Sequence, residues 1–279
     1  MTRIAFYGLG TMGLPMARNL VAAGHEVIGR DLDAGRAKEF SSEGAAEIAI
    51  ASLPSARAVE EVALGLLGSG VEVFVDMSTG PPALARRLAE ELGASGIASL
   101  DAPVSGGPRG AGAATLSIFV GGEAETFGRV KPLLRALGSV VAHVGGPGAG
   151  QVVKLCNNLM AGVNMAAVAE ACAVAAREGL DPGLFYELVT HSTGDSRVLR
   201  TRYPLPGADE SHPVNRDFEP MFMVDLIVKD LGLACDLAAE HGLDADVART
   251  ALAAYRHAQN RGLGRLDYSA VYRSESAEA

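Results

Sequence analysis

Three glycines near the N-terminus have the spacing of a dinucleotide-binding turn. Gly8, Gly10 and Gly13 follow a short apolar run, and Asp31 comes 18 residues after the last of them. In such a turn the first glycine permits the bend, the second lets the backbone approach a pyrophosphate, and the third lets the next helix pack on the strand. That helix offers free N–H groups to the phosphates, and the acid can accept both adenosine ribose hydroxyls. The pattern predicts a dinucleotide site; the alternative is a glycine turn without a ligand.

The acid also indicates which dinucleotide is bound. A carboxylate at Asp31 repels a 2′-phosphate and pairs with free ribose hydroxyls, so the sequence predicts NAD. Arg30 complicates this preference because its side chain can turn toward a phosphate, and NADP stays open as a second cofactor.

A lysine lies inside an apolar helical pattern in the middle of the chain. Lys154 and Asn158 are four residues apart, so a helix places both on one face. Burial lowers the pKa of a lysine and suits it to general acid–base work. The alternative is a lysine whose stem packs in the core while its ammonium group reaches water. The adjacent Asn157 and Asn158 favour the functional interpretation.

Two further groups have weaker patterns. Ser105, Gly106 and Gly107 follow an expected strand, where a hydroxyl and unobstructed N–H groups can hold a small carboxylate. An ordinary glycine turn explains these residues equally well. Lys229 and Asp230 lie in an expected helix. They are either functional residues or exposed charged residues on the helix surface.

The first half of the chain alternates strand and helix patterns, which would position these residues. Alternation predicts a parallel sheet covered on both faces, here a Rossmann-type doubly wound α/β domain over residues 1–147. Between Asp31 and Ser52 there is room for one minimal strand–helix–strand crossover. The expected strands are residues 4–7, 27–31, 48–52, 71–76, 98–101, 116–120 and 140–144, and the expected helices are 12–23, 34–41, 56–67, 82–92 and 124–137.

A break rich in glycine at residues 145–148 predicts a hinge, after which the pattern is helical. Residues 151–177 are apolar nearly all round, which is typical of a buried helix. This long helix would join an all-α domain over residues 148–279, with further helices at 182–191, 221–241 and 246–262. Residues 202–220 hold four prolines and predict a long connection that is functional or disordered. Residues 274–279 are expected to form a frayed tail.

Composition excludes several classes of function. The 279 residues carry 24 basic and 33 acidic side chains, a net charge of −9, without the basic block of a nucleic-acid-binding protein. Cys156, Cys172 and Cys235 form no CxxC pair, so we expect small core residues in a reducing cytoplasm and no metal site. The first strand begins near Arg3, which leaves no room for a leader, and no apolar run is expected to span a membrane.

Four motifs, in order, resemble the 3-hydroxyisobutyrate dehydrogenase family of β-hydroxyacid dehydrogenases, which is related to 6-phosphogluconate dehydrogenase. The resemblance covers nearly the whole chain, and four motifs in register are specific. It implies NAD-dependent oxidation of 3-hydroxyisobutyrate, or a close 3-hydroxy acid, to its semialdehyde, and a role in valine breakdown. The N-terminal, substrate-binding, catalytic-helix and C-terminal cofactor motifs are similar to FYGLGTMGLPMARNL, DAPVSGG, GAGQVVKLCNNLM and FMVDLIVKDLGLA.

The resemblance implies a role for each matching residue. Lys154 would be the general acid/base, and Asn158 would orient the substrate and the lysine. Asp230 would brace the helix that carries Lys229. The implied substrate-binding residues are Ser105, Gly106 and Gly107, and the implied cofactor-binding residues are Gly8, Leu9, Gly10, Thr11, Met12, Gly13, Asp31, Leu53, Pro54, Thr79 and Lys229.

The chain also departs from the family pattern. The segment between Phe40 and Leu53 lacks about a dozen residues that most relatives carry, roughly one strand and one connection, which affects the sheet edge and the adenine wall. Relatives that prefer NADP usually carry Arg where this chain has Leu32. The Pro-rich loop YPLPGADESHPVNRDFEPMF is similar to that of the members that act on branched acids.

Two other functions stay open. One is a tartronate, glyoxylate or succinic semialdehyde reductase using NAD(P)H, because the motifs are nearly shared. The more remote one is a non-catalytic nucleotide-binding scaffold, against which Lys154 and Asn158 argue. The apolar helices of the second domain exceed what a small domain can bury alone, so we expect a homo-dimer or homo-tetramer.

Overall fold

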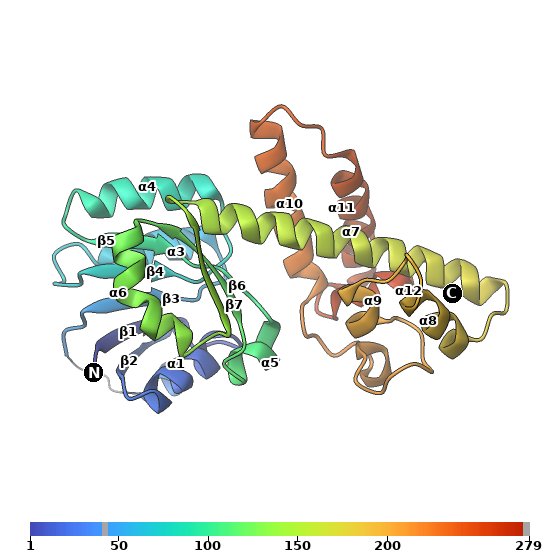
Figure 1. Cartoon of the computed structure of the whole chain (residues 1–279), viewed down its shortest axis with the longest axis horizontal. Helices are drawn as coiled ribbons and strands as arrows, with labels where there is room; N and C mark the ends of the chain where they lie inside the picture. Colours follow the sequence, from blue (N-terminus) through green and yellow to red (C-terminus); the bar gives the residue numbers. More distant parts are fainter. Residues whose placement is uncertain (41–43, 276–279) are drawn as a thin grey trace. The chain divides into compact units, whose positions relative to one another are not determined.

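The computed structural model describes residues 1–40 and 44–275 of the chain. The chain forms two compact units, Met1–Lys154 (unit 1) and Leu155–Ala279 (unit 2) (Figure 1). Residue 41, the expected end of the helix at 34–41, and residues 276–279 of the expected tail lie outside the described residues.

Unit 1 is built on an eight-stranded sheet. Its strands are β1 (Arg3–Tyr7), β2 (Glu26–Arg30), β3 (Ile48–Ala51), β4 (Val73–Asp76), β5 (Ala98–Asp101), β6 (Val104–Ser105), β7 (Ser117–Gly122) and β8 (Val140–Gly145). Their order is β2-β1-β3-β4-β5-β7-β6, and β8 pairs with β7. Every residue of β3 and β4 is buried, which is typical of strands covered on both faces.

Helices cover both faces of this sheet. They are α1 (Gly13–Ala22), α2 (Ala34–Ala37), α3 (Ala56–Gly65), α4 (Pro82–Gly93), α5 (Gly107–Gly112) and α6 (Ala124–Arg135). Ile48 and Ile50 of β3 belong to the apolar cluster that contains α1 and α6, whereas Ala49 and Ala51 belong to the cluster with α3 and α4. Successive side chains of a strand point to opposite faces, so this doubly wound arrangement follows from the strand itself.

The sheet is mixed, whereas the sequence pattern predicted a parallel one. Strands β1 to β5 pair in parallel, but β7 runs antiparallel to both β5 and β6. Eleven residues, 106–116, connect β6 to its neighbour β7, and a parallel neighbour needs a crossover of about a dozen residues or more. The segment 106–116 then turns the chain back, so β7 returns in the opposite direction. Neither β6 nor α5 was expected from the pattern.

The short segment after Asp31 leaves β2 at the end of the strand order. In the sheet, β1 lies between β2 and β3. In the sequence, β2 and β3 are connected by a segment whose helix, α2, has four residues. This is the single minimal crossover that the spacing predicted. The helix is shorter than the expected 34–41.

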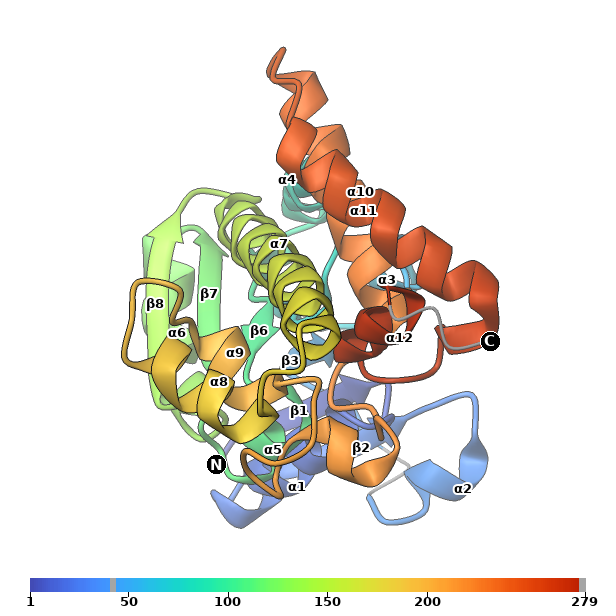
Figure 2. The ribbon, with the colours of Figure 1, turned by 90° about the vertical axis from the view of Figure 1, so that its right-hand side faces the viewer.

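Unit 2 is helical, and α7 (Ala149–Arg177) reaches it from unit 1. The other helices are α8 (Pro182–Thr190), α9 (Arg197–Arg202), α10 (Val224–Glu240), α11 (Asp246–Ala258) and α12 (Tyr272–Glu275), with the short turns η1 (Pro213–Arg216), η2 (Gln259–Leu263) and η3 (Tyr268–Val271). Helices α10 and α11 lie side by side (Figure 2) and share an apolar cluster with Met165 of α7. The buried Tyr255 hydroxyl donates to the Gly162 carbonyl oxygen at 3.0 Å, which satisfies its polar end.

Helix α7 corrects one expectation. Contrary to the sequence-based statement that no apolar run spans a membrane, its 29 residues include a window with a mean hydropathy of 1.6, enough to cross a membrane by length and composition. Of that window, 39% is buried inside the protein. The core helix of a globular domain passes the same test, so α7 is weak evidence for a membrane and the expected lack of a membrane partner stays a prediction.

Two smaller expectations are also corrected. Cys172 and Cys235 are buried as expected, but Cys156 is exposed. The Pro-rich segment 202–220 was expected to be structureless, yet it contains η1 and buries Tyr203, Leu205 and His212. Apolar and aromatic side chains among the prolines explain this, because they join an apolar cluster with residues of α7, α8 and α9.

Candidate active site

The glycine turn lies between β1 and α1, at the carboxyl end of the parallel strands. Gly8 has φ +91°, and an added Cβ would collide with the carbonyl oxygen of Ser52. Gly13 opens α1 with its Cα packed against the carbonyl of Gly8, so a side chain has no space there either. These are the first and third glycine roles that the spacing predicted.

The Asp31 carboxylate is hydrogen-bonded to the backbone of this turn. Its Oδ2 accepts a hydrogen bond from the Leu9 N–H at 2.7 Å, and its Oδ1 accepts one from the Asp33 N–H at 2.8 Å. A carboxylate has about four acceptor positions, so two are left for other donors. The adjacent hollow, of about 230 Å³, is lined by Leu9, Gly10, Thr11, Leu14, Pro15 and Arg36. The glycines, the carboxylate and this hollow fit a dinucleotide.

Arg36 is a residue of this hollow that the sequence reasoning missed. Its guanidinium Nη1 lies 3.9 Å from the place of a Cβ on Gly10, and its Nε lies 3.5 Å from the Asp33 carboxylate. Periodicity gave no signal, because Arg36 belongs to the short α2 and not to the glycine motif. Its charge adds to the attraction for phosphate groups at this edge.

Other expected cofactor-binding residues follow β3 and β4. Leu53 is half-buried, and its N–H donates to the Ser78 hydroxyl oxygen at 2.9 Å, while Pro54 is exposed. Thr79 follows Ser78, whose N–H donates to the Asp76 carboxylate at 2.9 Å. Of the turn residues, Leu9 is buried, Met12 is half-buried and Thr11 is exposed. The loops after β1, β3 and β4 therefore meet along neighbouring strands.

The expected carboxylate-binding residues lie at the turn from β6 into α5. Ser105 is the last residue of β6, and Gly106 and Gly107 have φ of +136° and +62°. An added Cβ on Gly106 would lie 3.0 Å from the Leu116 side chain. The positive φ values explain why glycine is needed at both positions.

The first turn of α7 is fastened to the ends of β4 and β5. The Asp101 carboxylate accepts from the Gly148 N–H at 2.7 Å and from the Gln151 N–H at 2.9 Å. The Gln151 side-chain amide accepts from the Gly80 N–H at 3.0 Å and donates to the Ser78 carbonyl oxygen at 2.9 Å. Burial raises the pKa of the Asp101 carboxyl, and these backbone donors partly offset the rise. Lys154, one turn later, is 7% exposed.

A second group of expected residues meets within unit 2. The Asn158 Nδ2 donates to the Asp230 carboxylate at 2.6 Å, and the Asn158 Oδ1 accepts from the Asn157 side chain at 3.0 Å. Lys229 lies 3.3 Å from the other oxygen of Asp230. Asp230 is 2% exposed. The alternative interpretation of the sequence, in which Lys229 and Asp230 are exposed charged residues on a helix surface, is therefore wrong for Asp230. The orientation of the Asn158 amide is set by these two partners.

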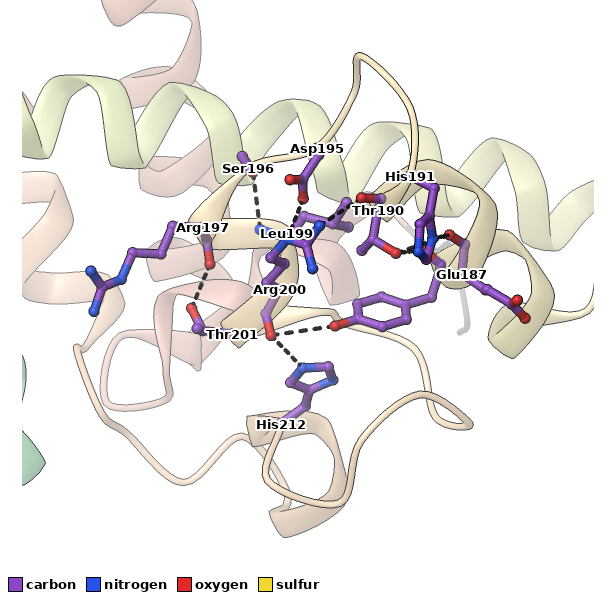
Figure 3. A network of polar contacts seen from close by, with 11 residues as sticks. Glu187, Thr190, His191, Asp195, Ser196, Arg197, Leu199, Arg200, Thr201 and His212 are labelled. Carbon is purple, nitrogen blue, oxygen red and sulfur yellow. Dashed lines mark hydrogen bonds and ion pairs between the residues drawn. The ribbon is translucent and has the colours of Figure 1, made fainter.

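The Pro-rich segment is held by a polar network around Arg200 (Figure 3). The Arg200 guanidinium donates to the Thr190 carbonyl oxygen at 2.6 Å and to the Asp195 carboxylate at 2.8 Å. Its own carbonyl oxygen accepts from His212 Nε2 at 2.9 Å. One arginine of α9 thus connects α8, the loop before α9 and the Pro-rich segment.

Comparison with known proteins decides the family. The family model for the NAD binding domain of 6-phosphogluconate dehydrogenase matches residues 3–145, and that for the NAD-binding domain of NADP-dependent 3-hydroxyisobutyrate dehydrogenase matches residues 148–274. A 3-hydroxyisobutyrate dehydrogenase of Pseudomonas aeruginosa is 40% identical, over 99% of this chain and 100% of the relative. The chain belongs to the 3-hydroxyisobutyrate dehydrogenase family.

Membership in this family makes the protein an oxidoreductase that binds a nicotinamide–adenine dinucleotide and acts on a hydroxy acid. The solved structure of Mycobacterium tuberculosis 3-hydroxyisobutyrate dehydrogenase with L-serine is similar, with a TM-score of 0.92 and 36% identity over 99% of this chain and 100% of that one. An NAD-dependent L-serine dehydrogenase of Pseudomonas aeruginosa is 37% identical over 97% of each chain. The Rossmann-type fold with a helical C-terminal region is thereby confirmed. The relatives differ in the hydroxy acid that their names give.

Proposed function

We propose that the protein oxidises 3-hydroxyisobutyrate, or a close 3-hydroxy acid, to its semialdehyde with NAD as hydride acceptor. The observation that carries the proposal is Lys154, buried on an apolar helix of an enzyme whose full-length relatives include 3-hydroxyisobutyrate dehydrogenases. Proton transfer to and from a hydroxyl is a step that this reaction requires, and the amine of a buried lysine can perform it.

Lys154 is the proposed general acid/base. In the oxidation, the neutral amine accepts the proton of the substrate hydroxyl, and in the reduction the ammonium returns it to the developing alkoxide. When bound, the dinucleotide supplies the hydride acceptor at its nicotinamide ring. Acid–base help of this kind is typically worth about 10²–10⁴-fold in rate. Asn158, whose amide is oriented by Asp230, is the proposed group that orients the substrate and the lysine.

Ser105, Gly106 and Gly107 are the proposed carboxylate-binding residues. A serine hydroxyl and two N–H groups without neighbouring side chains match the acceptor-only chemistry of a carboxylate. The proposed cofactor-binding residues are Gly8, Leu9, Gly10, Thr11, Met12, Gly13, Asp31, Leu53, Pro54, Thr79 and Lys229. The carboxylate at Asp31 supports NAD over NADP, because it repels a 2′-phosphate.

The second candidate substrate is L-serine, which is also a 3-hydroxy acid. It is favoured by the names of two relatives, a serine dehydrogenase and a solved structure with L-serine. The proposed chemistry at Lys154 is the same for both, since only the group on the carbon between the hydroxymethyl and the carboxylate differs.

The test is a comparison of initial rates of nicotinamide reduction near pH 9. 3-Hydroxyisobutyrate, L-serine, 3-hydroxypropionate, glycerate and 4-hydroxybutyrate would each be supplied with NAD and with NADP. We expect the highest kcat/KM for 3-hydroxyisobutyrate with NAD. A higher value for serine would select the second candidate, and a preference for glycerate or 4-hydroxybutyrate would move the enzyme to the semialdehyde reductases.

Lys154→Ala tests the proposed mechanism. We expect turnover to fall by about 10²–10⁴-fold, because the proton has no acceptor, while the dissociation constant for NAD stays within about threefold. Stopped-flow rates and a fluorescence titration of NAD measure the two quantities. Lys131→Ala on the surface of α6 is the control for loss of a lysine. Full turnover in the Lys154 variant would overturn the assignment.

A further inference from the structure

Two buried polar side chains, Asp101 at the end of β5 and Gln151 in the first turn of α7, have no part in the proposed reaction. Asp101 is 4% exposed and Gln151 is 1% exposed. Neither is needed to transfer a proton or a hydride in the mechanism above. A buried polar group costs free energy unless its hydrogen bonds are made, so the use of these two residues follows from their partners.

Asp101 holds the N-terminus of the helix to the end of β5. The N–H groups of Gly148 and Gln151 belong to the helix start, where backbone donors lack partners within the helix. A carboxylate at this end also complements the helix dipole. The contact is close, since an added Cβ on Gly150 would lie 2.9 Å from the Asp101 carboxylate. The helix start therefore has a defined position against β5.

Gln151 holds the same turn to the loop after β4. Its amide bonds to Ser78 and Gly80 bracket Thr79, which is proposed to contact the cofactor. The network extends further, because the Ser78 hydroxyl accepts from the N–H of Leu53, another proposed cofactor contact. A side-chain amide that donates and accepts in this way pairs with a backbone segment much as a peptide group would.

We propose that Gln151 and Asp101 are positioning residues that set the place of Lys154 relative to the Thr79 loop. Gln151 comes three residues before Lys154 on α7, so the two are neighbours on the helix surface. The inference rests on the proposed role of Lys154. Proton transfer requires atoms within hydrogen-bond reach, and a misplacement of about 1 Å can cost about 10²-fold in rate.

Gln151→Met tests the proposal, because methionine has a similar length and lacks the amide. We expect kcat to fall by about 10- to 100-fold, and the primary deuterium isotope effect on kcat, measured with substrate deuterated at the carbinol carbon, to rise as hydride transfer becomes rate-limiting. The dissociation constant for NAD should stay within about threefold, since the glycine turn is untouched. Thr126→Val, an isosteric change of a buried residue on α6, is the matched control and should leave kcat unchanged.

A purely structural role predicts a different result. It would lower the melting temperature while the folded enzyme kept its kcat and isotope effect. Unchanged kcat and isotope effect in folded Gln151→Met would overturn the proposal, and so would a loss confined to NAD affinity. If that variant does not fold, Asp101→Asn replaces it, because an amide keeps the shape but can accept only one of the two helix N–H bonds. The same fall in kcat with unchanged NAD affinity is expected, and an unchanged kcat contradicts the proposal.

Lys154→Ala separates this inference from the proposed function. If Lys154→Ala retains turnover, the proposed function fails whatever Gln151→Met does. If Lys154→Ala collapses and folded Gln151→Met keeps its kcat, the positioning inference alone fails.

Discussion

At the scale of single residues, Asp31 combines two tasks. Its hydrogen bonds to the N–H groups of Leu9 and Asp33 fix the carboxylate and connect the glycine turn to the end of β2. The carboxylate is therefore preorganised, and in the proposed cofactor site its negative charge would oppose a 2′-phosphate. The effect of the charge on the choice of cofactor can be tested by substitution.

Asp31→Asn tests the charge. The amide oxygen can still accept from the Leu9 N–H of the glycine turn, while the negative charge and the bond from the Asp33 N–H are lost. We expect the ratio of kcat/KM for NADP to that for NAD to rise by about tenfold or more, which corresponds to about 1.4 kcal/mol. Steady-state rates with both cofactors measure the ratio, with Asp33→Asn as the neighbouring acidic control. An unchanged ratio would contradict the role of the charge.

The three thiols are predicted to differ in reactivity. Burial raises the pKa of Cys172 to about 12 and also raises that of Cys235, whereas Cys156 is exposed. Because the thiolate is the reactive form, Ellman's reagent at pH 8 should label one thiol quickly in the native protein and all three after denaturation. Cys156→Ser should remove the fast phase. Fast labelling that persists in this variant would show that the burial assignments are wrong.

At the scale of elements, Asp267 joins the Pro-rich segment to the end of the chain. The carboxylate accepts from the N–H groups of Met221 and Phe222, both at 3.1 Å, and lies 3.4 Å from the Arg202 guanidinium. Ser269 donates to it as well. Asp267 is fully buried, so these partners replace the water that it loses. The segment is ordered by this carboxylate and by Arg200.

Asp267→Ala is expected to destabilise the protein by about 3–5 kcal/mol, because it leaves Arg202 and several N–H groups buried without their acceptor. Urea unfolding followed by circular dichroism measures the loss. Asp217→Asn is the control, since it removes the charge of an exposed ion pair with Arg273 at 3.9 Å and keeps a residue that tolerates the left-handed backbone at φ +48°; it should leave the midpoint unchanged. Equal effects of the two substitutions would contradict the importance of burial.

At the scale of the whole molecule, the two units contribute different structural features. Unit 1 presents loops at the carboxyl ends of neighbouring strands, as open α/β sheets do. Unit 2 supplies the polar group of Asn158, Asp230 and Lys229. Its helices also expose large apolar side chains, among them Val174 on α7 and Leu184 and Leu188 on α8. Such exposure is consistent with the expected association of chains.

We predict that the protein is a homo-dimer or homo-tetramer. Light scattering coupled to gel filtration should give at least twice the chain mass of 28.7 kDa. Replacing both Leu184 and Leu188 by arginine should lower the mass if α8 contributes to the interface, because buried unpaired charges oppose association. Leu243→Arg, at the exposed turn before α11, is the control. A wild-type mass of 28.7 kDa would overturn the prediction.

The Rossmann-type unit, the helical second unit and the family could all be predicted from the amino-acid sequence. These depend on local periods and on motifs of fixed spacing, such as Gly8, Gly10 and Gly13, which need no knowledge of distant contacts. Asp31, Lys154 and Asn158 were also predicted from residue type and spacing, whereas Leu53, Pro54 and Thr79 were implied only by the resemblance to the family.

The partners that hold those residues in place become visible only in the folded chain. The reversal of β7, the entry of Arg36 beside Gly10 and the burial of Asp230 depend on pairing between segments far apart in the chain. The bonds of Gln151 to Ser78 and Gly80 are the clearest case, since they join positions more than 70 residues apart. A sequence pattern indicates which side chains prefer burial. It does not indicate their hydrogen-bond partners, because a buried polar group bonds to whichever donor or acceptor the packing of distant segments brings within reach.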